Sequence, residues 1–235
     1  MTADPGVGSA AAVDVAVELT GVVKVFAAAA AVRVLDGVDL SVEPGEVVAV
    51  AGRSGSGKTT LLTIVAGWDA PDAGSVVVVG AQRAPHGPAW SEVAVVPQSL
   101  GLLEELTVAE NITLPGRLGK DGTAGSGTAG SDAATLMRQL AIDHLADRYP
   151  SEVSLGEQQR AAVARAAVVQ PRLLLADEPI AHQDAGRAEA IMFVLRRLAD
   201  TGTACLVATH NELAFEAADR CWSCTAAGSA RAPDR

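Results

Sequence analysis

The chain of 235 residues is poor in aromatic side chains, in basic side chains and in long apolar runs. Aromatic residues make up 3% of it, and no apolar run approaches the roughly 18 residues that a membrane-crossing helix needs. The 18 Lys and Arg residues face 28 Asp and Glu residues, which gives a formal net charge of −10. We expect no nucleic-acid partner, because affinity for a phosphate backbone needs a basic surface.

Cysteine is also scarce, and an odd number of three thiols suits a reducing compartment. The first residues, Met1 to Gly6, carry an acid where a secretion signal would carry a base. Both observations predict a cytoplasmic protein, so that any contact with a membrane would come through a partner. Cys221 and Cys224 have the spacing of a redox or metal pair, but no second pair accompanies them and we expect an incidental role.

The remaining composition is that of an ordinary globular protein, with 49% hydrophobic and 20% charged residues. A chain of this length buries a sizeable core and suggests one large domain or one domain with an inserted lobe. We expect this domain to span residues 14–224, with flexible tails at 1–13 and 225–235.

Short apolar strands alternate with helical patterns along most of the chain, which predicts a mainly parallel sheet. Residues 47–51 are apolar throughout, as in a strand buried on both faces, and residues 38–42 alternate at period two. The other predicted strands are 15–19, 22–25, 76–79, 93–96, 173–176 and 204–208. Helices are expected after residue 57 and over 185–199, and the N-terminal strands are expected to be antiparallel.

The middle of the chain, from about residue 100 to 169, is predicted to be a helical lobe. Between 105 and 169 the sequence shows no convincing strand. The run Thr107-Val108-Ala109-Glu110 is a capping-box pattern, which predicts that a helix starts at Thr107. Residues 119–131 are rich in Gly and Ser and are interpreted as a flexible insertion in this lobe.

A phosphate-binding pattern follows the buried strand at 47–51 and opens the next predicted helix. Residues 52–59 match G-x-x-x-x-G-K-[ST] in full. Its glycines let successive backbone N–H groups turn into one hollow, which binds phosphates together with the helix N-terminus. Lys58 is expected to reach the β- and γ-phosphates, and Thr59 to ligate Mg²⁺. The expected nucleotide contacts are Gly52, Arg53, Ser54, Gly55, Ser56, Gly57, Lys58, Thr59 and Thr60.

A second pattern, at 173–178, is an apolar strand that ends in two acids. Carboxylates at the C-terminal edge of a parallel sheet lie where ligands bind. Asp177 is expected to hold Mg²⁺, and Glu178 to take the proton from an attacking water. The guanine-specific tetrad Asn-Lys-x-Asp is absent, which disfavours a GTPase and leaves a small-molecule kinase open on these two patterns.

Further motifs carry a family resemblance. The run 154–160, Ser-Leu-Gly-Glu-Gln-Gln-Arg, precedes an Ala- and Val-rich helix and then the acidic strand. This arrangement resembles the signature motif of the ABC ATPases. Gln98 resembles the Q-loop glutamine of that family, Asp184 the D-loop aspartate and His210 the switch histidine. Phe26 lies where the family keeps an aromatic that stacks on adenine, and the resemblance covers about 15–222.

The resemblance implies an α/β fold, namely a P-loop NTPase core with a mixed, mainly parallel sheet, an N-terminal antiparallel β subdomain and an inserted α-helical lobe. It implies an ATPase that uses ATP and Mg²⁺, and it leaves the kinase reading without an account of the signature. Thr59, Gln98 and Asp177 would hold the metal. Glu178 would be the general base, with Lys58, Gln98 and His210 around the γ-phosphate.

The resemblance also implies partners. Ser154, Gly156 and Glu157 would contact the nucleotide of a second ATPase subunit across a head-to-tail dimer, in which Asp184 would take part. We expect a homodimer ahead of a heterodimer. An integral membrane permease would receive the closing motion near Gln98 and the helical lobe, which would place the chain at the inner face of the cell membrane.

Within the family, residues 106–112, 156–160 and 176–179 look like the short ATPases of lipoprotein-releasing, macrolide-export and cell-division type. They suggest export or lipoprotein release. An alternative is an ATP-dependent regulatory module that acts on a permease-like membrane protein without transport. A soluble ABC ATPase of DNA repair or translation is disfavoured by the acidic charge.

Some positions depart from the family pattern. Val153 and Leu155 stand where Leu and Gly are usual in the signature, and Gln183 precedes Asp184 where Leu is usual. From Cys221 onward the usual apolar strand is not evident. A slow ATPase, or a heterodimer with one degenerate site, therefore stays open.

Overall fold

The computed structural model of the chain describes residues 15–27, 31–78, 92–118, 128–224 and 230–231. The tail expected at 1–13, most of the insertion expected at 119–131 and most of the tail expected at 225–235 lie outside these residues. The remaining ends of those two expected segments have regular structure. Residues 128–131 form the first turn of α3 (Thr128–Gln139), and 230–231 form the short strand β9.

An antiparallel sheet is built from β1 (Val17–Phe26), β2 (Val32–Val42) and β4 (Ala73–Val78), in the order β2-β1-β4. It confirms the antiparallel N-terminal subdomain. β1 is one strand where two were predicted, because the pairing with β2 continues past Gly21 through register shifts. Gly21 has a φ of +58°, which a β-bulge accommodates without ending the ladder.

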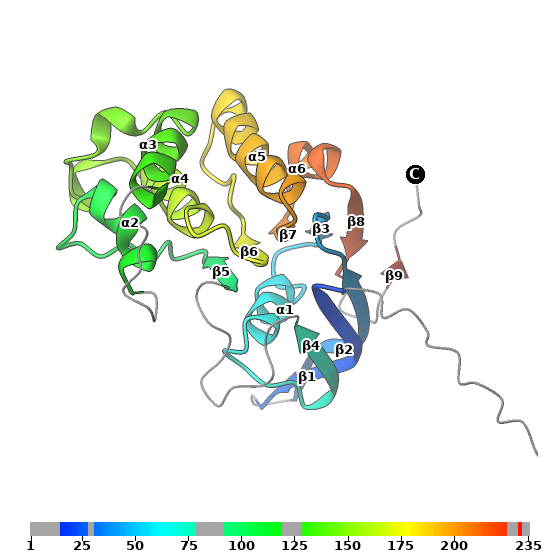
Figure 1. The fold of residues 1–235 in the computed structure, drawn as a ribbon. Helices are drawn as coiled ribbons and strands as arrows, with labels where there is room; N and C mark the ends of the chain where they lie inside the picture. The colour runs from blue at the N-terminus through cyan, green and yellow to red at the C-terminus, as the bar shows by residue number, and fades with distance from the viewer. Residues whose placement is uncertain (1–14, 28–30, 79–91, 119–127, 225–229, 232–235) are drawn as a thin grey trace, which may run out of the picture.

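The main sheet has the order β5-β6-β7-β3-β8-β9 in the described part of the chain (Figure 1). Its strands are β3 (Val47–Ala51), β5 (Val93–Val96), β6 (Leu173–Asp177), β7 (Ala204–Thr209), β8 (Arg220–Ser223) and β9 (Ala230–Arg231). All neighbours pair in parallel except β8 and β9. The parallel core of this sheet confirms the predicted topology.

The strand β8 corrects the expectation that no strand follows near Cys221. Its sequence, Arg-Cys-Trp-Ser, shows no apolar pattern, and for that reason it was missed. The backbone pairs in parallel with Val48–Ala51 of β3, and Trp222 is buried against the sheet. Pairing with a strand already in place decides the structure of this segment, which its own propensity does not.

The helices that surround the sheets are α1 (Lys58–Val65), α2 (Val108–Leu118), α3, α4 (Leu155–Ala167), α5 (Ala185–Asp200) and α6 (Glu212–Ala217). Short 3₁₀ turns at 143–145 and 150–152 join α3 to α4. The predicted capping box is present at the start of α2, because Glu110 N donates to Thr107 Oγ1 at 3.2 Å and Thr107 N to Glu110 Oε2 at 2.9 Å. No strand interrupts the described residues between 105 and 169.

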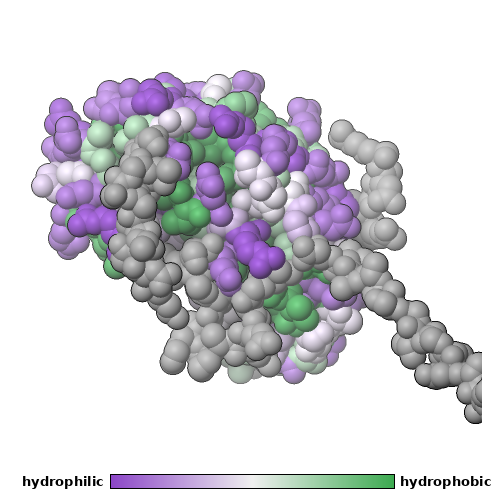
Figure 2. Space-filling model, in the orientation of Figure 1, coloured by the Kyte–Doolittle hydropathy of each residue, from purple (hydrophilic) through white to green (hydrophobic). Residues whose placement is uncertain are grey.

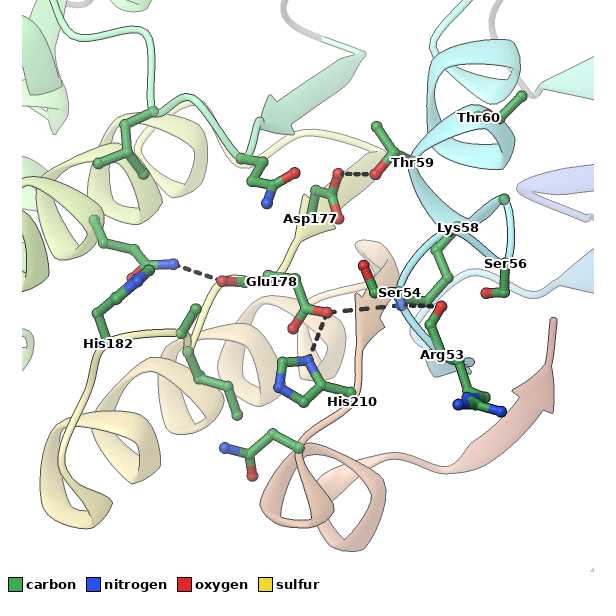
Figure 3. Close-up of a pocket in the computed structure, with 18 of the residues that line it drawn as sticks. Arg53, Ser54, Ser56, Lys58, Thr59, Thr60, Asp177, Glu178, His182 and His210 are labelled. Carbon is green, nitrogen blue, oxygen red and sulfur yellow. Dashed lines mark hydrogen bonds and ion pairs between the residues drawn. The ribbon is translucent and has the colours of Figure 1, made fainter. Parts of the chain in front are cut away.

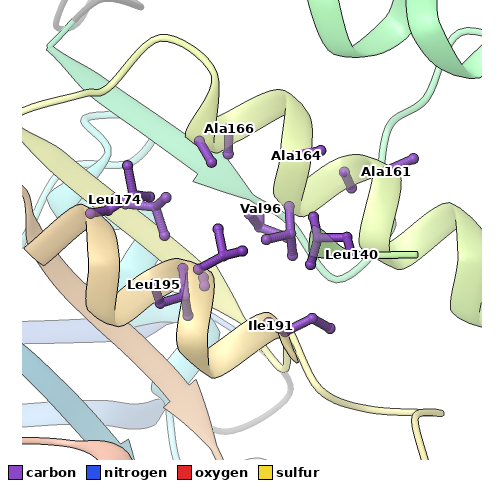
Figure 4. Packing of buried hydrophobic residues seen from close by; sticks show 14 of the residues in the cluster. Val96, Leu140, Ala161, Ala164, Ala166, Leu174, Ile191 and Leu195 are labelled. Atoms are coloured by element: carbon purple, nitrogen blue, oxygen red, sulfur yellow. The ribbon is translucent and has the colours of Figure 1, made fainter. Parts of the chain in front are cut away.

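Two apolar cores lie on opposite faces of the main sheet. On one face, Leu174 of β6 packs with Ile191 and Leu195 of α5 and with the small residues Ala161 and Ala164 of α4 (Figure 4). On the other face, α1 and the antiparallel sheet cover it. This layering is the expected P-loop NTPase fold, and it brings the C-terminal ends of β3, β5, β6 and β7 to one edge.

The surface of the molecule carries both hydrophilic and hydrophobic side chains. Figure 2 shows hydrophilic side chains along the upper rim of the view, over α3 and α5, and hydrophobic ones in the middle of the same face. Among the described residues, none of the helices combines the length and the apolar character that spanning a bilayer requires.

Candidate functional site

The loop between β3 and α1 is shaped by its glycines. Gly57 precedes α1 with a φ of +99°, and a Cβ there would lie 2.9 Å from Cγ1 of Val34. At Gly52, a Cβ would lie 2.3 Å from Oγ of Ser56, so the two ends of the loop approach too closely for any side chain. The loop is therefore a tight hollow at the N-terminus of a helix, as phosphate binding requires.

The charged group that is buried under this loop is Lys58. Its Nζ donates to the carbonyl of Gly52 at 2.8 Å and lies 3.8 Å from Oε1 of Glu178. A nucleotide phosphate entering the hollow would compete with both partners for this ammonium group.

The neighbouring hydroxyl, Thr59 Oγ1, donates to Oδ2 of Asp177 at 2.6 Å across the sheet edge. Burial raises the pKa of Asp177, and the hydrogen bond from Thr59 acts against that shift. Gln98 follows β5 and lines the same space as Thr59 and Asp177.

These oxygen donors fit Mg²⁺ in a particular way. Among the described residues, no group of three or more His, Cys, Asp or Glu side chains is placed to hold a metal ion. One carboxylate, one hydroxyl and one amide are the few ligands with which a protein binds Mg²⁺ when phosphates and waters complete the octahedron. The residues present therefore suit a metal that arrives with a nucleotide.

Glu178 is fixed through both its main chain and its side chain (Figure 3). Oε1 lies 2.8 Å from Nδ1 of His210, and Oε2 accepts from Thr209 Oγ1 at 3.1 Å. Its main-chain N donates to Ala208 O at 2.8 Å, and its carbonyl accepts from Nε2 of Gln159 at 2.5 Å. Glu178 has a φ of +51°, which is uncommon for a residue with a side chain and is typical of functional sites.

These groups surround one cavity of about 970 Å³. The residues expected from the sequence that line it are Arg53, Ser54, Gly55, Ser56, Gly57, Lys58, Thr59, Thr60, Gln98, Asp177, Glu178 and His210. Gly52 contributes its carbonyl to Lys58 from below. Four strand ends of the main sheet thus deliver phosphate-binding, acidic and imidazole groups to a single space.

The cavity also has walls that the sequence did not reveal. They are Val34, Leu100, Leu155, Gln159, Ile180, Ala181, His182, Gln183 and Asn211. Leu155 and Gln183 are two of the departures noted above, and that was the one signal available for them. Leu155 opens α4 in ordinary helical geometry and is half-exposed toward the cavity, so its side chain needs no strained backbone.

Four other expected contacts do not line this cavity, and within one chain they have structural roles. Ser154 is the N-cap of α4, where Glu157 Oε2 accepts from Ser154 N at 2.8 Å and Glu157 N donates to Ser154 Oγ at 3.4 Å. Ser154 Oγ also donates to Glu157 Oε2 at 2.8 Å, and this hydrogen bond, together with the one from Ser154 N, lowers the pKa of Glu157. Asp184 caps α5 by accepting from Arg187 N at 2.9 Å. Gly156 lies against the loop that precedes Asp184.

Phe26 lies elsewhere as well. It ends β1 opposite Val32, is 44% exposed, and has Lys24 Nζ 5.5 Å from its ring centre. Val34 of β2 lines the cavity in its place. Adenine stacking by Phe26 stays a prediction.

A second cavity, of about 390 Å³, adjoins the first and shares Thr59, Gln98 and Asp177 with it. Its outer wall includes Trp68, which is 63% exposed. The loop after Gln98 is held from α4, because Arg165 donates to Leu100 O at 2.6 Å and to the next carbonyl at 2.5 Å. Gln98 therefore stands between the two cavities on an anchored loop.

Comparison with known proteins agrees with this geometry. The family described as ABC transporter matches residues 35–181. The chain is 42% identical over 187 residues to the lipoprotein-releasing system ATP-binding protein LolD of Ruegeria pomeroyi, covering 77% of this chain and 81% of LolD. It is 38% identical over 193 residues to the sulfate/thiosulfate import ATP-binding protein CysA of Pseudomonas aeruginosa, covering 81% of this chain and 59% of CysA. The chain thus spans less than two thirds of that import protein.

Among solved structures, the fold is similar to the dimeric, post-hydrolysis state of the ATP-binding cassette MJ0796 bound to ADP and phosphate. The TM-score is 0.84 at 27% sequence identity, covering 93% of this chain and 98% of MJ0796. A nucleotide-free cassette from an ABC transporter, with a TM-score of 0.72 and 24% identity, shows the same fold.

Proposed function

The chain belongs to the ABC transporter family of ATPases, and from this premise we propose that it hydrolyses Mg·ATP as a transporter subunit, dimerises on ATP and drives a separate membrane permease. The observation that carries the proposal is the single cavity in which the phosphate-binding loop faces Glu178 and His210. Lys58 of that loop lies 3.8 Å from Glu178.

Nucleotide binding falls to the loop and to the start of α1. The backbone N–H groups of residues 53–58 and the helix N-terminus would receive the phosphates. Lys58 would exchange the Gly52 carbonyl for phosphate oxygens, a shift that its flexible stem permits. Thr59, Asp177 and Gln98 would hold Mg²⁺, which when bound would neutralise charge that develops on the phosphates.

Hydrolysis needs a base beside the terminal phosphate. Glu178 would accept a proton from the attacking water, and its carboxylate is oriented by Thr209 and His210 at 3.1 and 2.8 Å. The imidazole of His210 is largely exposed to the cavity, so it is placed to contact the γ-phosphate as well. Proton transfer and phosphate contact would thus meet at one oriented carboxylate.

A second subunit would complete the site. Ser154, Gly156 and Glu157 do not line the cavity of their own chain, although Leu155 between them is half-exposed on its wall. A partner's α4 N-terminus would bring a hydroxyl and free N–H groups to the γ-phosphate from the opposite side. The cassette MJ0796, which is dimeric with ADP and phosphate, supports this arrangement. Asp184 would lie at the same interface.

The permease would meet the second cavity, beside Trp68 and Gln98, because that cavity shares Thr59 and Asp177 with the nucleotide site. Such a partner would hold the chain at the inner face of the cell membrane. We propose a role in export or lipoprotein release, which the similarity to LolD over 81% of LolD's length supports. The similarity to CysA makes import the alternative that transport assays must separate.

Substitution Glu178→Gln tests the hydrolytic proposal. We expect turnover to fall by at least a hundredfold while ATP still binds, so that an ATP-bound dimer accumulates in size-exclusion chromatography. Glu189→Gln, on the exposed face of α5, is the matched control and should keep both turnover and monomer-dimer behaviour. Normal turnover in Glu178→Gln would refute the base assignment.

The transport proposal needs the membrane partner. We expect the chain to co-purify with an integral membrane permease and to hydrolyse ATP faster in that complex. Net movement of lipoprotein or a small molecule out of proteoliposomes would support release or export, and inward movement would contradict it. ATP-driven rearrangement of the permease without any transport would instead favour the regulatory module.

A further inference from the structure

A buried arginine lies beside the loop that carries Glu178. Arg160, on α4, is 7% exposed, and burial lowers its pKa. No carboxylate of the described residues lies within ion-pair distance of it, and its Nε has no hydrogen-bond partner among them. Its hydrogen bond to a side chain goes to a neutral amide, Oε1 of Gln183, at 2.8 Å. The carboxylates of Glu157 and Asp184 favour its charge from farther away, and Gln183 is the side chain that contacts it, so this buried cation depends on the amide for its hydrogen bond.

The other end of the same amide binds α4 again. Nε2 of Gln183 donates to Gly156 O at 2.9 Å and lies 3.4 Å from Oε1 of Gln159. Gly156, Gln159 and Arg160 follow one another at i, i+3 and i+4, so they share one face of the helix. Gly156 is small enough for this approach, since a Cβ there would lie 3.2 Å from Gln183 Nε2. One side chain thus fastens the first turns of α4 to the loop 178–183.

Gln159 connects Gln183 to the main chain of Glu178 through hydrogen bonds. Gln159 uses its Oε1 toward Gln183 and its Nε2 toward the Glu178 carbonyl, at 2.5 Å. That carbonyl also accepts from Ala181 N at 3.1 Å, which closes a turn that starts at Glu178, the residue with positive φ. The orientation of the Gln159 amide therefore couples the position of Gln183 to the backbone under the Glu178 carboxylate.

We propose that Gln183 is a positioning residue for hydrolysis: through Gln159 it holds the Glu178 backbone, and so the carboxylate, in register with the start of α4. The proposal rests on the hydrolytic role of Glu178 given above. It explains why an amide stands at 183, because an apolar side chain would leave Arg160 buried without its side-chain partner and Gln159 free to turn. It assigns Gln183 no contact with nucleotide.

Substitution Gln183→Glu separates positioning from stability. The carboxylate keeps a partner for Arg160, so the melting temperature should hold or rise. It cannot donate to Gly156 O, and it favours rotation of the Gln159 amide toward itself and away from the Glu178 carbonyl. We expect kcat to fall about tenfold with KM for ATP within twofold. Gln183→Met removes both hydrogen bonds of the amide, so we expect kcat and the melting temperature to fall together. Its control is Gln139→Met, in α3 and outside the nucleotide cavity, which should leave kcat and KM unchanged.

A second pair of variants tests the route through Gln159. Gln159→Met removes the donor to Glu178 O, and adding Gln183→Glu to it should lower kcat by less than a further twofold. If the two substitutions acted independently and each lowered kcat about tenfold, the double variant would lose about a hundredfold, and this result would overturn the proposal. A Gln183→Glu protein with wild-type kcat would overturn it as well. The hydrolytic proposal fails separately, if Glu178→Gln keeps turnover whatever the variants at 183 do.

Discussion

Oε1 of Glu178 lies 2.8 Å from Nδ1 of His210 and 3.8 Å from Nζ of Lys58. One carboxylate oxygen thus lies between the imidazole that follows β7 and the lysine that begins α1, in the proposed phosphate-binding loop. When Lys58 turns to a phosphate, the interaction with His210 and that of the other oxygen with Thr209 remain to orient the base. The position of Glu178 is therefore defined before nucleotide arrives.

Removing the imidazole should slow hydrolysis without weakening binding. For His210→Ala we expect kcat to fall about a hundredfold and KM to change by less than threefold, because the lost contacts act on the base and the transferred phosphate. His144→Ala, on an exposed 3₁₀ turn, is the matched control and should behave as wild type. A rise in KM that equals the loss in kcat/KM would instead make His210 a binding residue.

Lys58 should determine the affinity of the site for ATP. Lys58→Ala removes the buried ammonium that the hollow offers to the phosphates, and we expect the affinity for ATP to fall more than a hundredfold. A fluorescent ATP analogue measures this loss by titration, while circular dichroism verifies the fold. An affinity within threefold of the wild-type value would contradict the assignment of this loop to phosphate binding.

Two capping boxes of the same chemistry offer a matched comparison. Ser154→Ala at α4 and Thr107→Ala at α2 each remove a hydroxyl that accepts from the third residue of its helix. Each should cost about 1 kcal/mol of unfolding free energy. Only Ser154→Ala should also reduce ATPase activity, because only this hydroxyl is proposed to face a partner's nucleotide. Equal activity losses in both variants would remove that role from Ser154.

The cap at α4 should also make stability depend on pH. Hydrogen bonds from Ser154 lower the pKa of Glu157 in the folded chain, so its ionised form favours folding above the ordinary glutamate pKa. That contribution is lost as pH falls from the ordinary value through the lowered one. The stability difference between wild type and Ser154→Ala, followed by urea unfolding, should therefore shrink at acid pH. If the stability difference between wild type and Ser154→Ala grew at acid pH, this linkage to Glu157 would be wrong.

The three thiols should differ in reactivity. Burial raises the pKa of Cys205 to about 12 and also raises that of Cys224, whose thiol donates to the carbonyl of Ser56 at 3.0 Å. Cys221 is partly exposed. In maleimide labelling read by mass spectrometry, we expect Cys221 to react first and the other two only on opening, with ATP slowing Cys224 further. Equal rates for all three would contradict this placement.

Much of the site was predictable because its motifs end regular strands. The patterns at 52–59 and 173–178 named residues that the fold brings to one cavity, since parallel strands place their C-terminal ends on the same edge. Gln98 and His210 were predicted from the family resemblance, and each lies two residues beyond a predicted strand.

What the sequence did not reveal depends on contacts between distant segments. β8 forms by pairing with β3, and no pattern within four mixed residues announces that. Val34 lines the cavity because β2 crosses behind Gly57, a closeness that spacing along the chain does not encode. Gln183 looked like a departure from a pattern, and its partner Arg160 could be recognised only once α4 and the loop 178–183 were seen in contact.

The helix α4 forms hydrogen bonds to two loops, the one that begins at Glu178 and the one that follows Gln98. Near its start Gln159 holds the Glu178 carbonyl, and near its end Arg165 holds the backbone that follows Gln98. Six residues of continuous helix, or about 9 Å, separate these attachments. If the permease docks beside Gln98 as proposed, a tilt of α4 imposed there would also displace the Glu178 carbonyl, because the helix between the two attachments is continuous.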